Sequence, residues 1–242
     1  AFEQFPDAKT LLYEKDRQAH VIMGFKVTRL WDPPYLQVAL DLLEPDRAVT
    51  IAREAVRGGA DWVEAGTPLI KSAGMEAVRR LRAEFPDRER VADMKVADTG
   101  TLEVEMAAKS GASIVCILAT ADDEVVREAV RANHLYGVRI MAYLINSPDP
   151  AERAIRLEEL GVDIIAAHAG IDQQMVGLTS VELVKELAGR VSVPIAVAGG
   201  LDAESAAAAV RSGAGIIIVG GNIVRSGDVT GSTRLKASVA AS

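Results

Sequence analysis

Short apolar runs recur along the chain and alternate with segments whose apolar residues follow the period of a helix. Each run is continuous, which is typical of strands that are covered on both faces in a parallel sheet. The sequence predicts eight strands: Tyr35–Leu40, Trp62–Ala65, Arg90–Met94, Ser113–Leu118, Val138–Leu144, Asp163–Ala167, Val193–Ala198 and Gly215–Val219.

The segments between these runs have the spacing of amphipathic helices. Asp46–Arg57, Met75–Phe85, Glu124–Leu135 and Ala151–Leu160 each place their apolar residues on one stripe. Ser226–Ser242 is poor in large apolar residues, so we expect the last helix to be frayed or partly derived from a tag.

A glycine punctuates the chain where four of the helical segments end and a strand begins. Gly59, Gly111, Gly161 and Gly213 are plausible C-terminal helix caps. They recur at about twice the length of one strand–helix unit of a barrel. Strict alternation of eight strands with helices predicts an α/β fold, a (β/α)8 TIM barrel with a parallel eight-stranded sheet. Residues 35–242 form this barrel in our interpretation, and residues 1–34 form an N-terminal linker or extension.

Composition excludes several kinds of partner. The formal net charge is −7 with no long basic run, which argues against nucleic acid. No apolar stretch approaches the ~20 residues of a membrane-spanning helix, and we expect no signal peptide. The single cysteine, Cys116, excludes a disulfide framework and fits a reducing cytoplasm. Because it lies in an apolar run, we expect it to be a small buried hydrophobic residue.

Ionisable residues and glycine pairs gather where the predicted strands end. Catalysis in such barrels takes place at the carboxyl ends of the strands. The candidates there are Asp41, Glu64, Asp93, Lys95, Asp98 and His168, with the pairs Gly199-Gly200 and Gly220-Gly221. Asp93 and Lys95 are two positions apart, so their side chains should point the same way. Glycines after strands 7 and 8 are where barrels bind phosphate through backbone N–H groups.

Each of these residues also has a purely structural explanation. Asp41 and Asp98 could be helix N-caps, His168 could be a structural histidine, and the glycine pairs could be turn residues. Their combination favours an active site, because several ionisable groups at one inward-facing strand end are costly without a function.

Asp93-x-Lys95-x-x-Asp98 resembles the signature of the orotidine-monophosphate decarboxylase superfamily. The closer resemblance is to the 3-hexulose-6-phosphate synthase family. It rests on the segments Leu36–Asp41, Glu64–Ile70, Ala92–Lys95, Asp98–Gly100, His168–Gln174, Val197–Gly200 and Val219–Gly221. The stretch from Tyr13 to Pro34 resembles the junction of archaeal fusions with a formaldehyde-activating domain. We therefore expect this chain to be the synthase half of a bifunctional protein.

The resemblance implies a reaction and a set of roles. Formaldehyde would add to a small phosphosugar, D-ribulose 5-phosphate, to give D-arabino-hex-3-ulose 6-phosphate. Mg²⁺ (or Mn²⁺) held by Glu64 and Asp93 would stabilise an enediolate, and His168 would be the general base. Asp41 and Lys95 would contact substrate hydroxyls. Asp98 would reach the neighbouring site of a cytoplasmic homodimer, and the four glycines named above would hold the phosphate.

Three other functions remain open. A Schiff-base aldolase would use Lys95 as the nucleophile, but this needs a lowered lysine pKa, and Asp93 and Asp98 should raise it. A decarboxylase of a related sugar acid phosphate or of orotidine monophosphate is the second, although His168-Ala169-Gly170 favours the synthase. A barrel scaffold whose chemistry is lost or redesigned is the third.

Four positions depart from the synthase pattern: Val96 replaces a usual Thr, Ala119 a usual Gly, and Ala142-Tyr143 a usual Val-Asp. All four lie near strand ends, so we expect them to touch the pocket and to make the chain a poor synthase, through natural drift or through engineering. The alternative for Tyr143 is that it faces the helices and packs in the outer core.

Overall fold

Eight parallel strands pair in sequence order, and the last pairs with the first to close a barrel. The computed structural model describes residues 34–170 and 180–240. The expected extension 1–34 therefore lies outside the described residues except for Pro34, as does Ile171–Gln174 of one synthase-like segment. The strands are β1 (Tyr35–Leu40), β2 (Trp62–Ala65), β3 (Glu89–Val96), β4 (Ile114–Leu118), β5 (Arg139–Tyr143), β6 (Ile164–His168), β7 (Ile195–Ala198) and β8 (Ile216–Val219). The predicted (β/α)8 fold is confirmed.

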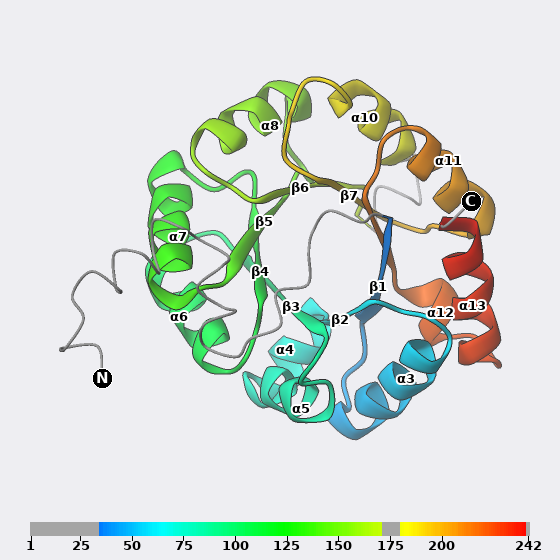
Figure 1. Ribbon diagram of the computed structural model, residues 1–242. Coiled ribbons are helices and arrows are strands. Elements are labelled where there is room, and N and C mark those ends of the chain that lie inside the picture. The colour runs from blue at the N-terminus through cyan, green and yellow to red at the C-terminus, as the bar shows by residue number, and fades with distance from the viewer. Residues whose placement is uncertain (1–33, 171–179, 241–242) are drawn as a thin grey trace, which may run out of the picture. The chain divides into compact units, whose positions relative to one another are not determined.

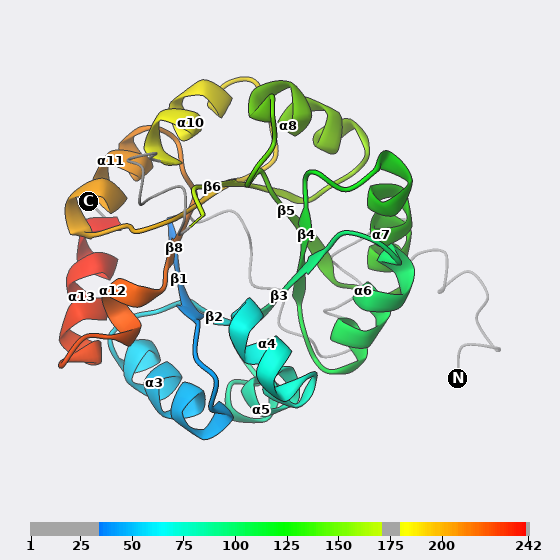
Figure 2. The same ribbon diagram turned by 180° about the vertical axis from the view of Figure 1, so that it is seen from behind.

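Helices form a ring outside the strands, as Figures 1 and 2 show from the two ends of the barrel. They are α3 (Pro45–Arg57), α4 (Thr67–Ala73), α5 (Glu76–Glu84), α6 (Gly100–Lys109), α7 (Asp123–Tyr136), α8 (Pro150–Glu159), α10 (Ser180–Leu187), α11 (Ala203–Arg211), α12 (Gly221–Val224) and α13 (Val229–Ala240). None of these helices has both the length and the apolar character needed to cross a membrane.

The predicted glycine punctuation is present in the structure. Gly59, Gly111, Gly161 and Gly213 have φ angles of 105°, 102°, 93° and 109°, in the left-handed region that favours glycine. Directly after Gly59, the amide of Ala60 donates to the carbonyl of Ala55 at 3.0 Å, which closes α3 before β2 begins.

Two segments differ from the expectation. The connection between β2 and β3 holds two helices, α4 and α5, because Gly74 at φ 62° interrupts the helical path. The final segment forms α13, so the prediction of a frayed end is wrong for Val229–Ala240. Small residues explain its packing, since a Cβ on Gly58 would lie 2.7 Å from the Cβ of Thr233. The Thr230 hydroxyl also donates to the carbonyl of Glu54, which ties α13 to α3.

Alternate side chains of the strands face the helices or the barrel interior. At the amino end of the barrel the interior is filled: Tyr35 stacks on Trp62 with 5.2 Å between ring centroids. Arg139 and Glu89 form a buried ion pair nearby, with 3.2 Å between Nη1 and Oε1. Cys116 is fully buried, as expected. The opposite, carboxyl end carries the cavity described next.

Candidate active site

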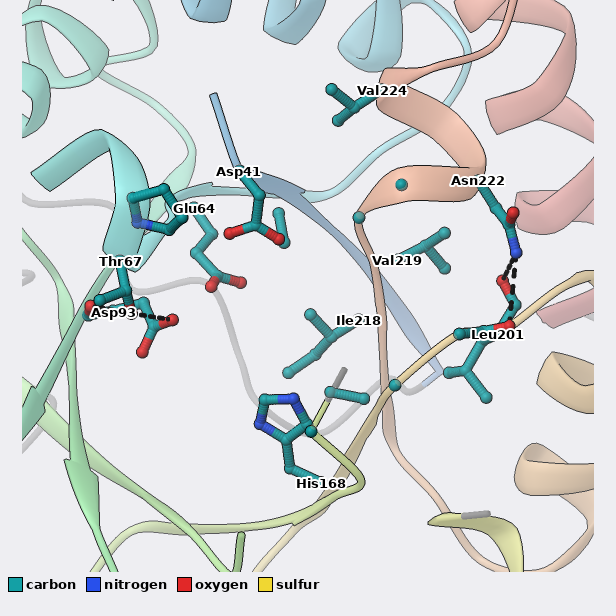
Figure 3. A pocket seen from close by; sticks show the side chains of 18 of the residues that line it. Asp41, Glu64, Thr67, Asp93, His168, Leu201, Ile218, Val219, Asn222 and Val224 are labelled. Atoms are coloured by element: carbon teal, nitrogen blue, oxygen red, sulfur yellow. Dashed lines mark hydrogen bonds between the residues drawn. The ribbon is translucent and has the colours of Figure 1, made fainter. Parts of the chain in front are cut away.

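A cavity of about 730 Å³ opens where the carboxyl ends of the strands meet (Figure 3). Strand ends from both halves of the barrel supply its walls. The sequence-predicted residues that line it are Asp41, Glu64, Asp93, Lys95, His168, Gly199, Gly200, Gly220 and Gly221. Asp98 is the one candidate that does not line it. The structure thus brings together nearly all of the residues that the strand-end pattern selected.

Three carboxyl groups converge on one side of the cavity. Glu64 is 2% exposed, and burial together with the charges of Asp93 and Asp41 raises its pKa well above the usual value. Burial and the charge of Asp93 also raise the pKa of Asp41. One oxygen of Asp93, Oδ1, is buried without a hydrogen-bond partner among the described residues. Such crowding disfavours the charged carboxylates unless a cation compensates it.

A residue that the sequence reasoning did not single out supports the deepest carboxylate. Gln37 points into the barrel from β1, is fully buried, and its Nε2 donates to Glu64 Oε2 at 2.5 Å. Gln37 lies two residues before Ala39, so both side chains face the barrel interior from β1. Its role can be recognised only once it is known which residues of β1 point inward. The bond fixes one oxygen of Glu64 and leaves the other free to face the cavity.

This donor set fits a hard divalent cation. Among the described residues, no three His, Cys, Asp or Glu side chains form a complete metal cluster. Mg²⁺, however, is commonly held by one or two carboxylates, with water and substrate oxygens completing its shell. Glu64 and Asp93 supply two carboxylates from neighbouring strands, and the unpartnered Oδ1 of Asp93 is an oxygen suited to this role.

Asp41 is seated between two glycines. A Cβ on Gly66 would lie 2.3 Å from Asp41 Oδ1, and one on Gly220 would lie 3.1 Å from Oδ2. Helix α3 begins later, after Glu44, and has no side-chain cap. The N-cap interpretation of Asp41 is therefore wrong, since its carboxylate is directed into the cavity (Figure 3).

Lys95 reaches the cavity through an irregularity in β3. The register against β4 shifts between Ala92 and Val96, and Lys95 has a φ of 50°, which is uncommon for a residue with a side chain. Asp93 and Lys95 do face the same cavity as predicted, and their side chains form an ion pair. Regular alternation alone does not produce this contact, because the strand is locally bulged.

Thr67 joins this ion pair into a network. Lys95 Nζ donates to Thr67 Oγ1 at 2.8 Å, and that hydroxyl donates to Asp93 Oδ2 at 2.7 Å. Burial alone would lower the pKa of Lys95, but the charge and hydrogen bond of Asp93 and the charge of Glu64 outweigh it and raise the pKa. The expected effect of Asp93 is thus present, whereas Asp98 has no part in it. A raised pKa disfavours Lys95 as a Schiff-base nucleophile.

His168 ends β6 and faces Tyr143. The two rings meet edge-to-face, with 4.9 Å between centroids. Burial, and then the charge of Lys95, lowers the pKa of His168 to about 4. The pKa of this imidazole is thus well below the ordinary histidine value. The imidazole is neutral at pH 7, and its Nδ1 is buried without a partner among the described residues.

The glycine pairs that follow β7 and β8 form a further wall of the cavity, together with two polar residues. Gly199 and Gly200 have φ angles of 115° and 67°, which a residue with a side chain would adopt only under strain. Asn222 Nδ2 donates to the carbonyls of Leu201 at 3.0 Å and Gly200 at 3.3 Å (Figure 3), so it ties the turn after β7 to the turn after β8.

Arg225 brings a positive charge to this wall. A Cβ on Gly221 would lie 2.3 Å from Arg225 Nη2, so the guanidinium folds back over the glycine only because no side chain is there. Arg225 lines the cavity, one turn after Gly221. The sequence reasoning missed Thr67, Asn222 and Arg225, although the first two directly follow motif glycines.

Asp98 lies outside the cavity of this chain. It is exposed, and its Oδ1 accepts a hydrogen bond from the amide of Thr99 at 2.7 Å, before α6 begins. That bond closes a local turn and does not cap the first turn of the helix.

Of the four departures from the synthase pattern, only Tyr143 lines the cavity. Val96, Ala119 and Ala142 belong to the hydrophobic core, where they are at most 1% exposed. The expectation that all four touch the pocket is wrong for these three. Val96 and Ala142 face away from the cavity because neighbouring residues of a barrel strand face opposite sides, and Ala119 follows the end of β4 and packs in the core. The alternative placement of Tyr143 in the outer core is also wrong.

Comparison with known proteins identifies the family of the chain. Residues 34–234 match the family described as "Orotidine 5'-phosphate decarboxylase / HUMPS family". The chain belongs to this family. Its described strands and every cavity residue named above fall within the matched range.

The relatives refine this assignment. The chain is 38% identical over 231 residues to the "Bifunctional enzyme Fae/Hps" of Methanoregula boonei, a match that covers 95% of this chain and 58% of the relative. It thus spans less than two thirds of that relative's length, and the expected resemblance to such fusions is confirmed.

The structure is similar to 3-hexulose-6-phosphate synthase from Salmonella typhimurium, with a TM-score of 0.82, 31% identity and coverage of 86% of this chain and 98% of that one. It is also similar to KGPDC from Streptococcus mutans, with a TM-score of 0.78, 26% identity and coverage of 86% of this chain and 97% of that one.

Proposed function

We propose that this chain catalyses the aldol addition of formaldehyde to C1 of D-ribulose 5-phosphate, giving D-arabino-hex-3-ulose 6-phosphate, and the reverse cleavage. One observation carries the proposal: a neutral imidazole, a carboxylate pair suited to a cation and a glycine-built anion wall with an arginine share one cavity. The similarity to 3-hexulose-6-phosphate synthase supports the choice of substrates.

The phosphate group would bind at the glycine wall. Backbone N–H groups of Gly199, Gly200, Gly220 and Gly221 would hydrogen-bond its oxygens, and Arg225 would supply the countercharge. The sugar then extends toward Lys95 on β3 and His168 on β6. Asp41 accepts a hydrogen bond from a substrate hydroxyl.

Proton transfer would run through His168. The neutral imidazole accepts the C1 proton, and the electrons of the C1–H bond form the enediolate. C1 then bonds to the carbonyl carbon of formaldehyde, and the new alkoxide takes a proton from the imidazolium, which restores the neutral base. Lys95, kept charged by Asp93, stabilises negative charge on the substrate oxygens.

A divalent cation is part of the proposal. Glu64 and Asp93 would hold Mg²⁺ or Mn²⁺, which as a Lewis acid lowers the energy of the negatively charged enediolate. The convergence of Glu64, Asp93 and Asp41 supports this, because a cation would offset their mutual repulsion.

The working unit would be a cytoplasmic homodimer in which Asp98 serves the neighbouring site. Asp98 is exposed beside α6, whose Leu102 and Met106 are 56% and 41% exposed. Apolar side chains of this size favour contact with a second copy. The buried free thiol of Cys116 is compatible with a reducing compartment.

The decisive experiment incubates the purified chain with ribulose 5-phosphate, formaldehyde and Mg²⁺ and measures hexulose phosphate. Exchange of the C1 proton with solvent, without formaldehyde, tests the first half-reaction separately. Product formation that depends on both substrates is the expected result. Absence of both product and exchange would refute the proposal, and release of CO₂ from a 3-keto sugar acid phosphate would favour the decarboxylase.

A further inference from the structure

Tyr143 contacts two of the groups that carry the proposed chemistry. It ends β5, is 1% exposed, and meets the imidazole of His168 edge-to-face. Its ring also lies under the ammonium of Lys95, 5.2 Å from Nζ to the ring centroid. One aromatic ring thus contacts both the imidazole at the end of β6 and the ammonium group of the lysine on β3.

The ring is anchored at its far end. The Tyr143 hydroxyl lies next to the thiol of Cys116 on β4, and both side chains are buried in the barrel. The strand register supports this arrangement, because Cys116 and Tyr143 both point inward from neighbouring strands. A tyrosine held at both ends cannot turn away from its neighbours without opening the core.

The same anchor removes Tyr143 from proton transfer. Its hydroxyl is turned toward Cys116, and burial raises its pKa well above the usual value. The Tyr143 hydroxyl therefore stays protonated and takes no part in the proposed acid–base steps. What remains in contact with the reactive groups is the apolar ring.

Among the described residues, His168 lacks the hydrogen bond that commonly orients a catalytic imidazole. Its Nδ1 is buried without a partner in that part of the chain. The charged or titratable groups that face it are Lys95 and Asp93 from β3 and Tyr143 from β5. Of these, Tyr143 is in ring contact.

We propose that Tyr143 is a positioning residue for proton transfer, whose ring holds the His168 imidazole in place of a hydrogen bond to Nδ1 and also packs against the Lys95 ammonium. The inference rests on the proposed function for its kinetic consequence. The orientation and shielding of His168 by the ring do not depend on which substrate binds.

Three variants separate the ring from the hydroxyl and from general packing. Tyr143→Phe keeps the ring and loses the hydroxyl next to Cys116. Tyr143→Met removes the ring but fills the space with a flexible apolar side chain. Met141→Leu is the matched control, because Met141 is a fully buried, inward-facing residue of the same strand outside the cavity.

The substrate-independent readout is the titration of His168 by NMR. The chain has three histidines, and His168→Gln assigns the signal. We expect Tyr143→Met to move the His168 titration to higher pH, because water reaches the imidazole. Tyr143→Phe and Met141→Leu should titrate as the parent does. An unchanged titration in Tyr143→Met would overturn the proposal, as would an equal change in Tyr143→Phe.

The kinetic readout is C1 proton exchange with ribulose 5-phosphate. Tyr143→Met should lower kcat by roughly 10–100-fold with KM changed less than about 3-fold, since a misplaced base loses part of its ~10²–10⁴-fold contribution. If Met141→Leu lost kcat as well, the result would show that Tyr143 acts only through packing of the barrel interior. If the parent exchanges no proton, the proposed function fails, while the NMR result still decides the positioning role.

Discussion

The ammonium of Lys95 pairs with the carboxylate of Asp93 two residues earlier, across a register shift at which Lys95 takes a φ of 50°. In an unstrained strand these side chains would stand side by side without an enforced contact. The left-handed turn costs on the order of 1–3 kcal/mol. The structure holds the lysine there beside Thr67 and Asp93, in the wall of the cavity.

The first prediction concerns the lysine and the dimer. Lys95→Ala should lower kcat/KM by about 10²–10³-fold, because an ammonium aimed at developing negative charge is lost. Asp98→Asn should also be nearly inactive if Asp98 serves the neighbouring site. Mixed subunits of the two variants should regain activity, since one site in each hybrid keeps both groups. Sedimentation should show a dimer, and a monomer at assay concentration would contradict this prediction.

The second prediction concerns the cation. Mg²⁺ should raise the Tm of the parent, because a ligand that binds only the folded state stabilises it. Glu64→Gln should abolish this shift, and chelation should abolish the aldol reaction until Mg²⁺ is restored. Glu84→Gln is the control, since Glu84 pairs with Arg53 on the surface. Full activity after exhaustive chelation would exclude the metal role.

The third prediction concerns pH. The folded-state pKa of His168 is lowered to about 4, so the neutral base persists down to that pH and exchange should fall only below it. The unfolded chain binds this proton near pH 6.5, so His168 costs stability progressively as the pH falls from 6.5 toward 4. The loss is at most about 3 kcal/mol.

His168→Gln should therefore flatten the stability profile between these pH values and lower C1 exchange by roughly 10²–10⁴-fold. Denaturant titrations at several pH values measure the first effect. An exchange profile of the parent that falls with a midpoint near 6.5 would show that the imidazole is not shielded.

The fourth prediction concerns the phosphate wall. Arg225→Ala should lower kcat/KM for ribulose 5-phosphate by about 10–100-fold, as expected for loss of one charge-assisted hydrogen bond. Asn222→Ala should act in the same direction through KM, because it releases the turn that holds Gly200 and Leu201. Arg234→Ala, an exposed arginine of α13, is the control. The assay is steady-state kinetics, and equal effects in all three variants would argue against a specific anion site.

The strands and most of the site could be predicted from the sequence, because both depend on local patterns of apolar, ionisable and glycine residues. Continuous apolar runs fix the barrel, and strand ends fix which carboxylates and glycines meet. The bulge at Lys95 did not follow, since it depends on the register of β3 against β4. The pKa of His168 depends on what encloses it, and Arg225 is directed by the absence of a side chain on Gly221. Val96, Ala119 and Ala142 were wrongly expected in the pocket, because nearness to a strand end does not show whether a side chain faces the cavity or the surrounding helices.

The last prediction separates two departures from the synthase pattern. Val96 packs in the core, so Val96→Thr should bring no gain in kcat/KM and should cost ~1–3 kcal/mol of stability if its hydroxyl finds no partner. Tyr143→Asp changes the cavity itself. A carboxylate can hydrogen-bond the unpartnered Nδ1 of His168, which would replace the orientation that the ring provides. A negative charge beside the imidazole also raises its pKa.

We therefore expect the parent to be a slow synthase and Tyr143→Asp to raise kcat/KM for ribulose 5-phosphate while moving the exchange profile to higher pH. Tyr143→Asn is the control, because it offers similar size and a hydrogen bond without the charge. Equal gains in both variants would assign the effect to pocket volume and not to charge. A parent that turns over at ordinary enzyme rates of ~1–10³ per second, with no gain on reversion, would show that the tyrosine serves this site as well as the aspartate does.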